Sequence, residues 1–287
     1  MEETERELLS DPFDTALGVE YREAVVTFID ILGFQAFVKE RTADQVASAI
    51  SRLQQSVQPV ASGAKRGSTA RPISSSRVHA FSDCIVRVRL FEDDDDEGPT
   101  LIRELADLAS IQASLSIAGV FVRGGVTIDK IHSSDSAVFG PGLIRAYKLE
   151  SELAHVPRIV VDPATIQRFR ARRIPKSRMS REITATRKAI RQADDGLWFV
   201  DYLRASAVAL GGEHDVRDML LQHREQVTKA AADVDVGSSV LPKYLWAARY
   251  HNASCERILD TATSGVTISK AQLPSYERLR LPVLLSR

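Results

Sequence analysis

The sequence has few cysteines and no apolar run long enough to cross a membrane. Cys84 and Cys255 are the two cysteines among 287 residues, and they form no CxxC pair, which excludes a disulfide framework. We therefore expect a reduced, cytoplasmic protein in which each cysteine is a small buried side chain. No apolar run approaches the roughly 20 residues of a membrane-spanning helix. Residues 1–14 are acidic, where a signal peptide is basic and then apolar.

An excess of charge of one sign is also absent. Lys and Arg together number 38, as do Asp and Glu. A chain of zero net charge has no general electrostatic attraction to nucleic acid or to an anionic membrane surface, so we expect neither among its partners. Hydrophobic residues make up 44% and charged residues 26% of the chain. This composition excludes a fibrous or wholly disordered protein.

The hydrophobic periodicity predicts an α+β fold. Apolar β-branched runs and alternating runs predict strands, and apolar residues at helical spacing predict the helices between them. The order is strand, helix, paired strands, helix, strand, helix, strand, which indicates an α/β sandwich of the ferredoxin-like kind. The expected strands cover 24–31, 77–83, 84–90, 118–132 and 157–163, the expected helices cover 43–58, 100–117 and 141–154, and a loop covers 61–76.

Three regions follow from the change of composition along the chain. Residues 1–20 lack periodicity and are expected to form an arm, residues 21–165 form the α+β domain, and residues 166–287 form a mainly helical C-terminal extension packed on it. The extension is expected to hold an Arg-rich helical stretch at 164–192, a possible strand at 197–203 and helices at 213–231 and 240–260.

Two aspartates are the first candidates for chemistry. Asp30 ends the first expected strand, and Asp83 lies at the tip of the hairpin between the next two. In a ferredoxin-like sheet these segments are neighbours, so the two carboxylates would converge, and oxygen ligands of this kind suit Mg²⁺ or Mn²⁺. Taken singly, an aspartate at a strand end is more often a cap or a turn residue.

The motifs around these aspartates resemble the catalytic domain of class III nucleotidyl cyclases. The resemblance rests on FIDILGF (28–34), the hairpin Asp83, VRGGVTI (122–128), and the A-x-K-L run at Ala146, Lys148 and Leu149. These four motifs follow the family order over roughly residues 21–163. The resemblance implies a class III cyclase domain at 21–165 with sites shared across a homodimer.

The same resemblance implies roles for individual residues. Asp30 and Asp83, with the backbone of Ile31, would hold two divalent cations, Mn²⁺ or Mg²⁺. These cations would activate the ribose 3′-hydroxyl and bind the phosphates. The backbone from Ile31 through Leu32 and Gly33 to Phe34 would cradle the triphosphate.

The sequence departs from the purine cyclases at four family positions. His79 and Ala137 stand at the two base-reading positions, so neither purine-reading side chain is present. Ile144 stands at the transition-state Asn position and Lys148 at the transition-state Arg position. Lys148 can still act as a point cation, and the resemblance leaves Arg145 to supplement it. His79 can equally be a half-buried strand residue without a ligand role.

A narrower resemblance covers most of the chain. FIDILGF, FSDCIV, RGGVTI, FGPGLIRAYKLE, WFVDYL and KYLWAARYHN together resemble the pyrimidine cyclases of bacterial Pycsar antiphage systems. The resemblance implies that UTP is converted to cyclic UMP, a second messenger that activates a separate effector protein. The alternatives are a cytidylate cyclase that makes cyclic CMP, a catalytically silent nucleotide sensor, and a purely structural dimerisation module.

Several other residues have simpler expected roles. His214 and His223 lack the spacing of a zinc site and are expected to be structural or exposed. Arg123 is expected to bind phosphate or to form a structural ion pair. The pair Gly124-Gly125 predicts close backbone approach in the sheet. Tyr244, Trp246 and Tyr250 are expected to pack between the last helix and the first domain.

Overall fold

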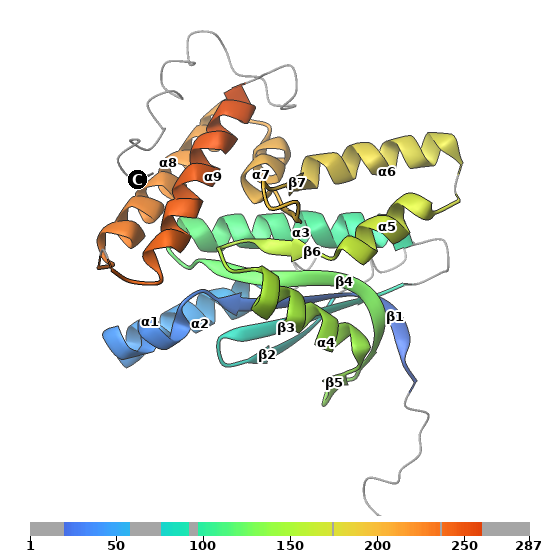
Figure 1. The fold of residues 1–287 in the computed structure, drawn as a ribbon, viewed down its shortest axis with the longest axis horizontal. Coiled ribbons are helices and arrows are strands. Elements are labelled where there is room, and N and C mark those ends of the chain that lie inside the picture. The colour runs from blue at the N-terminus through green and yellow to red at the C-terminus, as the bar shows by residue number, and fades with distance from the viewer. Residues whose placement is uncertain (1–19, 58–75, 92–96, 174, 236, 260–287) are drawn as a thin grey trace, which may run out of the picture.

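The computed structural model describes residues 20–57, 76–91, 97–173, 175–235 and 237–259 (Figure 1). The expected arm at 1–20 and loop at 61–76 lie almost entirely outside these residues. The strands are β1 (Arg22–Ile31), β2 (Arg77–Phe81), β3 (Cys84–Leu90), β4 (Val122–Ser133), β5 (Val138–Phe139), β6 (Ile159–Val161), β7 (Ile190–Gln192) and β8 (Trp198–Val200). The helices are α1 (Phe34–Glu40), α2 (Ala43–Val57), α3 (Glu97–Ile117), α4 (Pro141–Lys148), α5 (Pro163–Ala171), α6 (Lys176–Ala189), α7 (Tyr202–Leu210), α8 (Glu213–Ala232) and α9 (Leu241–Leu259), with a π-helical segment at Leu149–Leu153.

One mixed sheet organises the chain and confirms the α+β class. Its strand order is β2-β3-β1-β4-β6-β8-β7. The first four strands are antiparallel neighbours, in the order that the ferredoxin-like pattern predicts. β6 runs parallel to β4, and the two-residue β5 pairs with β4 beside this path. The central strand β1 therefore lies between β3 and β4, which makes the end of β1 a meeting point of three strands.

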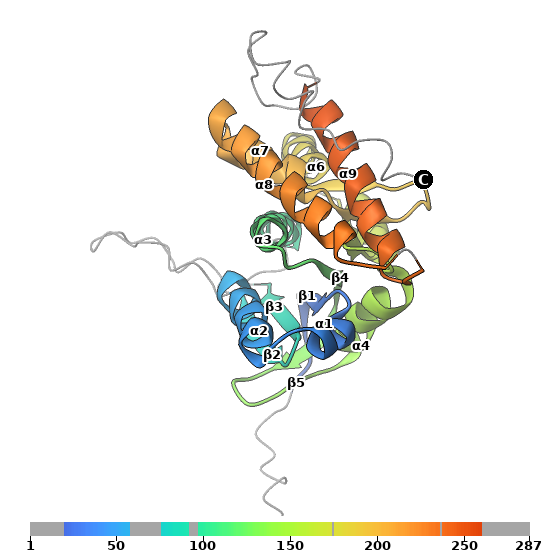
Figure 2. The same ribbon diagram turned by 90° about the vertical axis from the view of Figure 1, so that its left-hand side faces the viewer.

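Each face of the sheet has its own core, because successive strand residues point to opposite faces. On one face, Val25 and Ile29 belong to the large core that includes α3. On the other face, Val26 packs with Val86 and with Ala146 of α4. Figure 2 shows α3 and α4 on opposite sides of the sheet. Asp30 continues the series of alternate residues that face α4.

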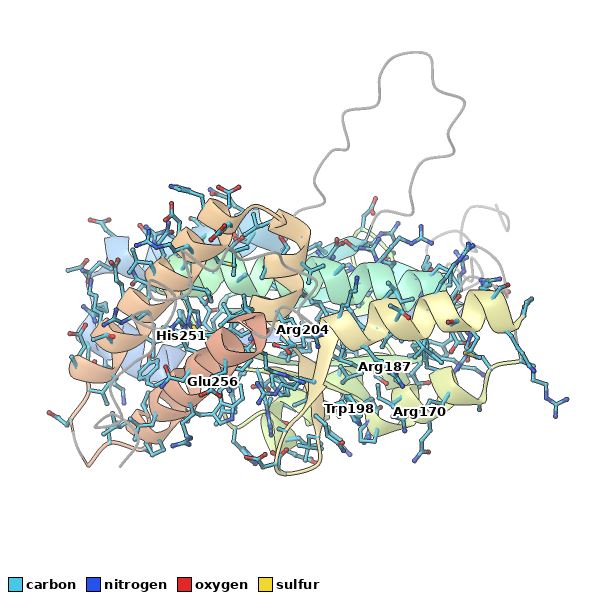
Figure 3. All side chains as sticks on the ribbon, turned by 90° about the horizontal axis from the view of Figure 1, so that it is seen from above. Arg170, Arg187, Trp198, Arg204, His251 and Glu256 are labelled. Carbon is cyan, nitrogen blue, oxygen red and sulfur yellow. The ribbon has the colours of Figure 1, made fainter. Side chains whose placement is uncertain are left out.

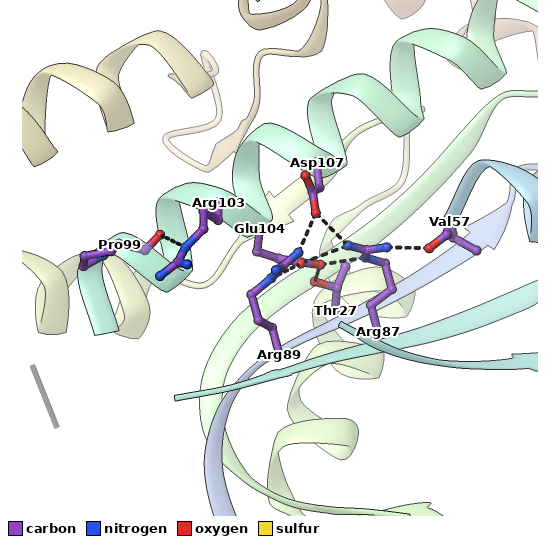
Figure 4. A network of polar contacts seen from close by, with 8 residues as sticks. All are labelled: Thr27, Val57, Arg87, Arg89, Pro99, Arg103, Glu104 and Asp107. Atoms are coloured by element: carbon purple, nitrogen blue, oxygen red, sulfur yellow. Dashed lines mark hydrogen bonds and ion pairs between the residues drawn. The ribbon is translucent and has the colours of Figure 1, made fainter. Parts of the chain in front are cut away.

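A buried ionic network ties β3 to α3 (Figure 4). Arg87 and Arg89 each bind the carboxylate of Glu104, with Nε–O distances of 2.8 and 3.0 Å. Both also form ion pairs with Asp107, which is half exposed. Arg87 donates in addition to the carbonyl of Val57 at 2.6 Å, which anchors the end of α2. Two arginines inside the domain are thus matched by two carboxylates, as the cost of burying charge requires.

The C-terminal extension continues the sheet and covers α3. β8 pairs with β6 and then with β7, so the sheet crosses the expected boundary at residue 165. Figures 1 and 2 show α3 between the sheet and the layer formed by α6, α7 and α8. The guanidinium of Arg170 lies over the ring of Trp198 in β8, with its Cζ atom 5.6 Å from the centroid of that ring (Figure 3). Within the described ranges, none of the helices combines the length and apolarity that crossing a bilayer requires.

The aromatic residues of α9 pack as the sequence predicts. Trp246 and Tyr250 stack with their ring centroids 5.4 Å apart, and both contact the ring of Phe199 in β8. Tyr244 instead meets Phe121, just before β4, at 5.4 Å. The last helix is therefore joined to both the α+β domain and the added strands.

Four expectations require correction. The helix expected at 141–154 ends as an α-helix at Lys148 and continues as the π-helical segment, in which Ala154 N donates to Leu149 O. The possible strand at 197–203 ends at Val200, because the chain turns at Asp201 into α7. The stretch 164–192 is two helices, interrupted near Pro175, followed by β7. Cys84 is half-buried, whereas Cys255 is buried as expected.

Candidate active site

The structure brings Asp30 and Asp83 together at one end of the sheet. Asp30 is the penultimate residue of β1 and pairs with Cys84 of β3. Asp83 immediately precedes Cys84 in a tight turn, where Ser82 has a φ of 54°. The backbone N–H of Ile31 donates to the carbonyl of Asp83 at 3.2 Å. The antiparallel pairing of β1 with β3 therefore places the two carboxylates beside each other.

Arg123 and Glu150 complete this charged group. Arg123 is the partner of Asp30 in β4, and its Nη2 and Nε lie 3.1 and 3.3 Å from Asp30 Oδ2. The same Nε lies 2.6 Å from Oε1 of Glu150, a buried residue of the π-helical segment. Of the two roles expected for Arg123, the structure therefore shows the structural ion pair. Glu150 was not among the residues expected from the sequence.

Close packing explains how Glu150 reaches the sheet. A Cβ on Gly125 would lie 2.4 Å from Leu149 Cβ and 2.5 Å from the carbonyl of Ala146. Only glycine leaves room for this approach, as the Gly124-Gly125 pair predicts. Insertion of an extra residue into the helix turn is a frequent feature of functional sites, and here it aims Glu150 at Arg123.

The site carries more negative charge than its cations balance. Burial, followed by the charges of Glu150 and Asp83, raises the pKa of Asp30 to about 7, although Arg123 acts in the opposite direction. Burial also raises the pKa of Glu150, and Asp83 adds to the effect. The thiol of Cys84 responds to the same surroundings, because burial and the two aspartates raise its pKa to about 11. Such a carboxylate group has an affinity for cations.

The donor set fits a hard divalent cation. Within the described ranges, no group of three or more His, Cys, Asp or Glu side chains is arranged to enclose a metal ion. Two convergent carboxylates are instead part of the incomplete oxygen shell typical of Mg²⁺ sites that are completed by water and substrate phosphates. A cation here would also relieve the repulsion from Glu150 and Asp83 that adds to the effect of burial on the pKa of Asp30.

The loop after β1 offers only its backbone to a ligand. The side chains of Ile31 and Leu32 are buried in separate cores, and Leu32 N donates to Phe121 O at 2.9 Å. Gly33 has a φ of 72°, in the left-handed region that favours glycine. Phe34 then begins the short helix α1.

The two residues at the expected base-reading positions both contact the end of β4. His79 Nε2 is 3.0 Å from Ser133 Oγ at the end of β4. The next residue, Ser134, donates its backbone N–H to Ala137 O at 2.8 Å. Burial and the neighbouring Arg77 lower the pKa of His79, which favours the neutral imidazole. His79 and Ala137 therefore bond to two consecutive residues, Ser133 and Ser134, at the end of β4.

The expected transition-state residues lie on α4, apart from the aspartates. Arg145 is held by Asp162 through bonds of 2.8 and 2.7 Å, and Asp162 also caps α5. Lys148, in the last turn of α4, is exposed. Ile144 is exposed to 59% and Tyr147 to 52%. Within one chain, α4 thus presents a cation and apolar side chains to its surroundings.

Lys243 is a second residue that the sequence reasoning did not assign. It lies in the first turn of α9, where burial and the charge of Arg123 lower its pKa while Asp30 raises it. Both Lys243 and Glu150 stand in segments quoted for the resemblance, KYLWAARYHN and FGPGLIRAYKLE. The feature of the sequence that could have identified these two residues is a charged residue at the end of a largely apolar or aromatic segment.

Neither a family model nor a curated protein sequence matches the chain. Among solved structures, the adenylyl cyclase CyaB from P. aeruginosa is 13% identical, with a TM-score of 0.41, over 63% of this chain and 94% of that one. A class III adenylyl cyclase-like ATP-binding protein from Pseudomonas aeruginosa is 14% identical, with a TM-score of 0.39, over 58% of this chain and 40% of that one. A bacterial light-regulated adenylyl cyclase is 16% identical, with a TM-score of 0.34, over 52% and 44%. These are similarities of fold.

Proposed function

We propose that the chain is a nucleotide cyclase that converts UTP to 3′,5′-cyclic UMP and pyrophosphate. The observation that carries the proposal is the pairing of Asp30 with Asp83 in a partly buried site. Burial, together with the charges of Glu150 and Asp83, raises the pKa of Asp30 there to about 7. Without a role in binding cations, such a grouping would only reduce stability. The proposal assigns Asp30, Asp83 and the carbonyl of Ile31 to two divalent cations, Mg²⁺ or Mn²⁺.

The reaction is an intramolecular displacement. The ribose 3′-oxygen attacks the α-phosphorus, the bond to the bridging oxygen of the β-phosphate breaks, pyrophosphate leaves and the hydroxyl proton passes to solvent. When bound, the cations would lower the pKa of that hydroxyl and neutralise the phosphates. The backbone of Gly33 and Phe34 would orient the triphosphate, because the N–H of Leu32 is bound to Phe121 O. Asp30 and Asp83 would keep the cations at the end of β1 and β3.

His79 and Ala137 support a pyrimidine substrate. Ala137 has no group that can pair with a purine edge, and a neutral His79 can donate to or accept from a base without adding charge. Its ring already meets Ser133 Oγ at 3.0 Å, which orients it. The alternative within the same class is CTP, converted to cyclic CMP.

The exposed face of α4 supports a homodimer with shared sites. Ile144 and Tyr147 on α4 are exposed, as is Phe139 of β5, and large exposed apolar side chains that gather on one face are typical of interfaces. In a dimer through this face, Lys148 would reach the partner's phosphates, with Arg145 beside it. Ile144→Glu should give a monomer in size-exclusion chromatography and abolish turnover. A dimeric Ile144→Glu protein with full activity would contradict this arrangement.

The proposed cellular role follows from the resemblance in sequence. Cyclic UMP would act in the cytoplasm as a second messenger of antiphage defence and activate a separate effector. Expression of the chain during phage infection should raise cyclic UMP in cell extracts, and Asp30→Asn should prevent the rise.

One assay tests the reaction. Purified protein is incubated separately with ATP, GTP, CTP and UTP, with Mn²⁺ and then with Mg²⁺, and the products are resolved by chromatography and mass. We expect cyclic UMP from the wild type and none from Asp30→Asn or Asp83→Asn, with circular dichroism unchanged. Cyclic CMP would identify the alternative substrate.

A silent nucleotide sensor is the second candidate. Ile144 at the position of a transition-state Asn favours it, as does the engagement of Arg145 with Asp162. Nucleotide binding without any cyclic product, under all the conditions above, would support this candidate against the cyclase.

A further inference from the structure

The first turn of α9 lies against the loop that follows β1. Val240 Cγ1, directly before the helix, is 4.0 Å from the position of a Cβ on Gly33. Tyr244 contacts the ring of Phe121, whose carbonyl accepts the N–H of Leu32. Leu32, Phe121 and Tyr244 belong to one hydrophobic cluster. The C-terminal extension therefore forms one wall of the candidate site, within the same chain as Asp30.

Lys243 is the cation that this wall brings to the site. It is half-buried at the start of α9, where the charges of Arg123 and Asp30 act on its pKa. Within the described part of the chain, its ammonium forms no ion pair, whereas Arg123 is bound to both Asp30 and Glu150. A partly desolvated lysine without a carboxylate partner is costly and is suited to receive an anion.

We propose that Lys243 binds the triphosphate of the nucleotide, so that the C-terminal extension supplies a substrate-binding residue. The proposal rests on the proposed function and deepens it. With all side chains ionised, the net charge of the site is minus one, because it holds three carboxylates and two cations. The carboxylates are those of Asp30, Asp83 and Glu150, and the cations are Arg123 and Lys243. Two divalent cations and a fully ionised nucleoside triphosphate cancel one another, so the filled site keeps the same balance. Lys243 is repelled by the cations and attracted by phosphate oxygens, which places it at the phosphate side.

A binding experiment with inorganic tripolyphosphate tests the proposal independently of the base. Isothermal titration calorimetry with Mg²⁺–tripolyphosphate compares full-length wild type, Lys243→Met, Lys243→Arg and Lys229→Met. Lys229 is an exposed lysine near the end of α8 and serves as the matched control. Methionine keeps the length of the apolar stem while removing the charge. Melting temperatures of all four proteins report any general loss of stability.

The expected result is a selective loss of affinity. Lys243→Met should raise the Kd for Mg²⁺–tripolyphosphate by about tenfold to a hundredfold, the range for a lost hydrogen bond to a charged group. Lys243→Arg should recover most of the affinity, and Lys229→Met should match the wild type. An unchanged Kd in Lys243→Met would overturn the proposal, and so would a wild type that does not bind tripolyphosphate.

Turnover separates this proposal from the cyclase proposal. A wild type that makes a cyclic nucleotide while Lys243→Met keeps its KM would refute the role of Lys243 and leave the reaction intact. A wild type that makes no cyclic nucleotide but binds tripolyphosphate through Lys243 would refute the reaction and leave the role of Lys243 intact. If the role of Lys243 is purely structural, Lys243→Met should lower the melting temperature without changing the Kd.

Discussion

Arg123 binds Asp30 across the β1–β4 strand pair, with Nη2 3.1 Å from Oδ2. Because the same guanidinium also contacts Glu150, it joins two carboxylates that would otherwise repel each other. The arginine therefore maintains the site in the absence of a cation, and its removal should affect stability as well as binding.

Replacing Arg123 should leave the buried carboxylate of Glu150 without its ion-pair partner and so reduce stability. Arg123→Met should lower the free energy of unfolding by about 3 kcal/mol, the typical effect of removing one partner of a buried ion pair. Urea denaturation measures the change. Adding Glu150→Gln to the variant should restore part of the loss, because the unpaired charge is then gone. A double variant no more stable than Arg123→Met would contradict this reading.

The raised pKa of Asp30 predicts a dependence of stability on pH. Between the ordinary pKa of an aspartate, about 4, and the folded value of about 7, the folded protein holds a proton that the unfolded chain releases. Asp30 therefore makes the metal-free protein less stable as the pH rises through this window. This contribution is measured as the change with pH of the difference in melting temperature between the wild type and Asp30→Asn. Mg²⁺ should raise the melting temperature more at about pH 8 than at about pH 5.5, since protonated Asp30 cannot bind it.

A stacked histidine pair between α8 and α9 predicts the opposite slope. His223 and His251 are fully buried, with Nδ1 atoms 3.0 Å apart, and Tyr202 meets His223 Nε2 at 2.8 Å. Burial and His251 hold the pKa of His223 well below its usual value. As the pH falls below about 6.5, the unfolded chain gains a proton that the folded chain excludes, so stability should decrease by at most about 1.4 kcal/mol per pH unit. His223→Gln should flatten this slope in denaturation curves.

The network of Figure 4 predicts unequal costs for its two carboxylates. Glu104→Gln leaves Arg87 and Arg89 without their buried partner and should destabilise the protein by about 3–5 kcal/mol. Asp107 is 51% exposed, so Asp107→Asn should cost less than about 1 kcal/mol. Chemical denaturation of both variants measures the difference. Equal losses would show that burial does not set the energetics of this network.

The parts of the fold that depend on local periodicity could be predicted from the sequence. The apolar β-branched run along β1 and the alternation along β3 predict strands, and their antiparallel pairing is enough to bring Asp30 to Asp83. The class of fold follows from the order of these elements. The left-handed Gly33 lies two residues after the expected strand at 24–31, whereas the short helix α1 that follows it was not expected from the periodicity.

The rest depends on contacts between distant segments, which periodicity does not encode. Glu150 lies in a stretch whose apolar spacing fits a regular helix, and the π-helical turn results from packing on Gly125. The charge of Asp30 acts on the pKa of Lys243 because the start of α9 packs against the loop after β1. The sequence likewise indicates a possible strand at 197–203 but not its pairing with β6, because pairing between distant segments leaves no periodic signal.

The pairing of β8 with β6 has a consequence for aggregation. All three residues of β6 are inaccessible to solvent, and one side of this strand is covered by β8 alone in the described sheet. A chain cut at residue 165 would present β6 as a bare apolar edge, a template for pairing with another molecule. By pairing with β6, strand β8 of the extension thus covers this edge and keeps the α+β domain from associating edge to edge.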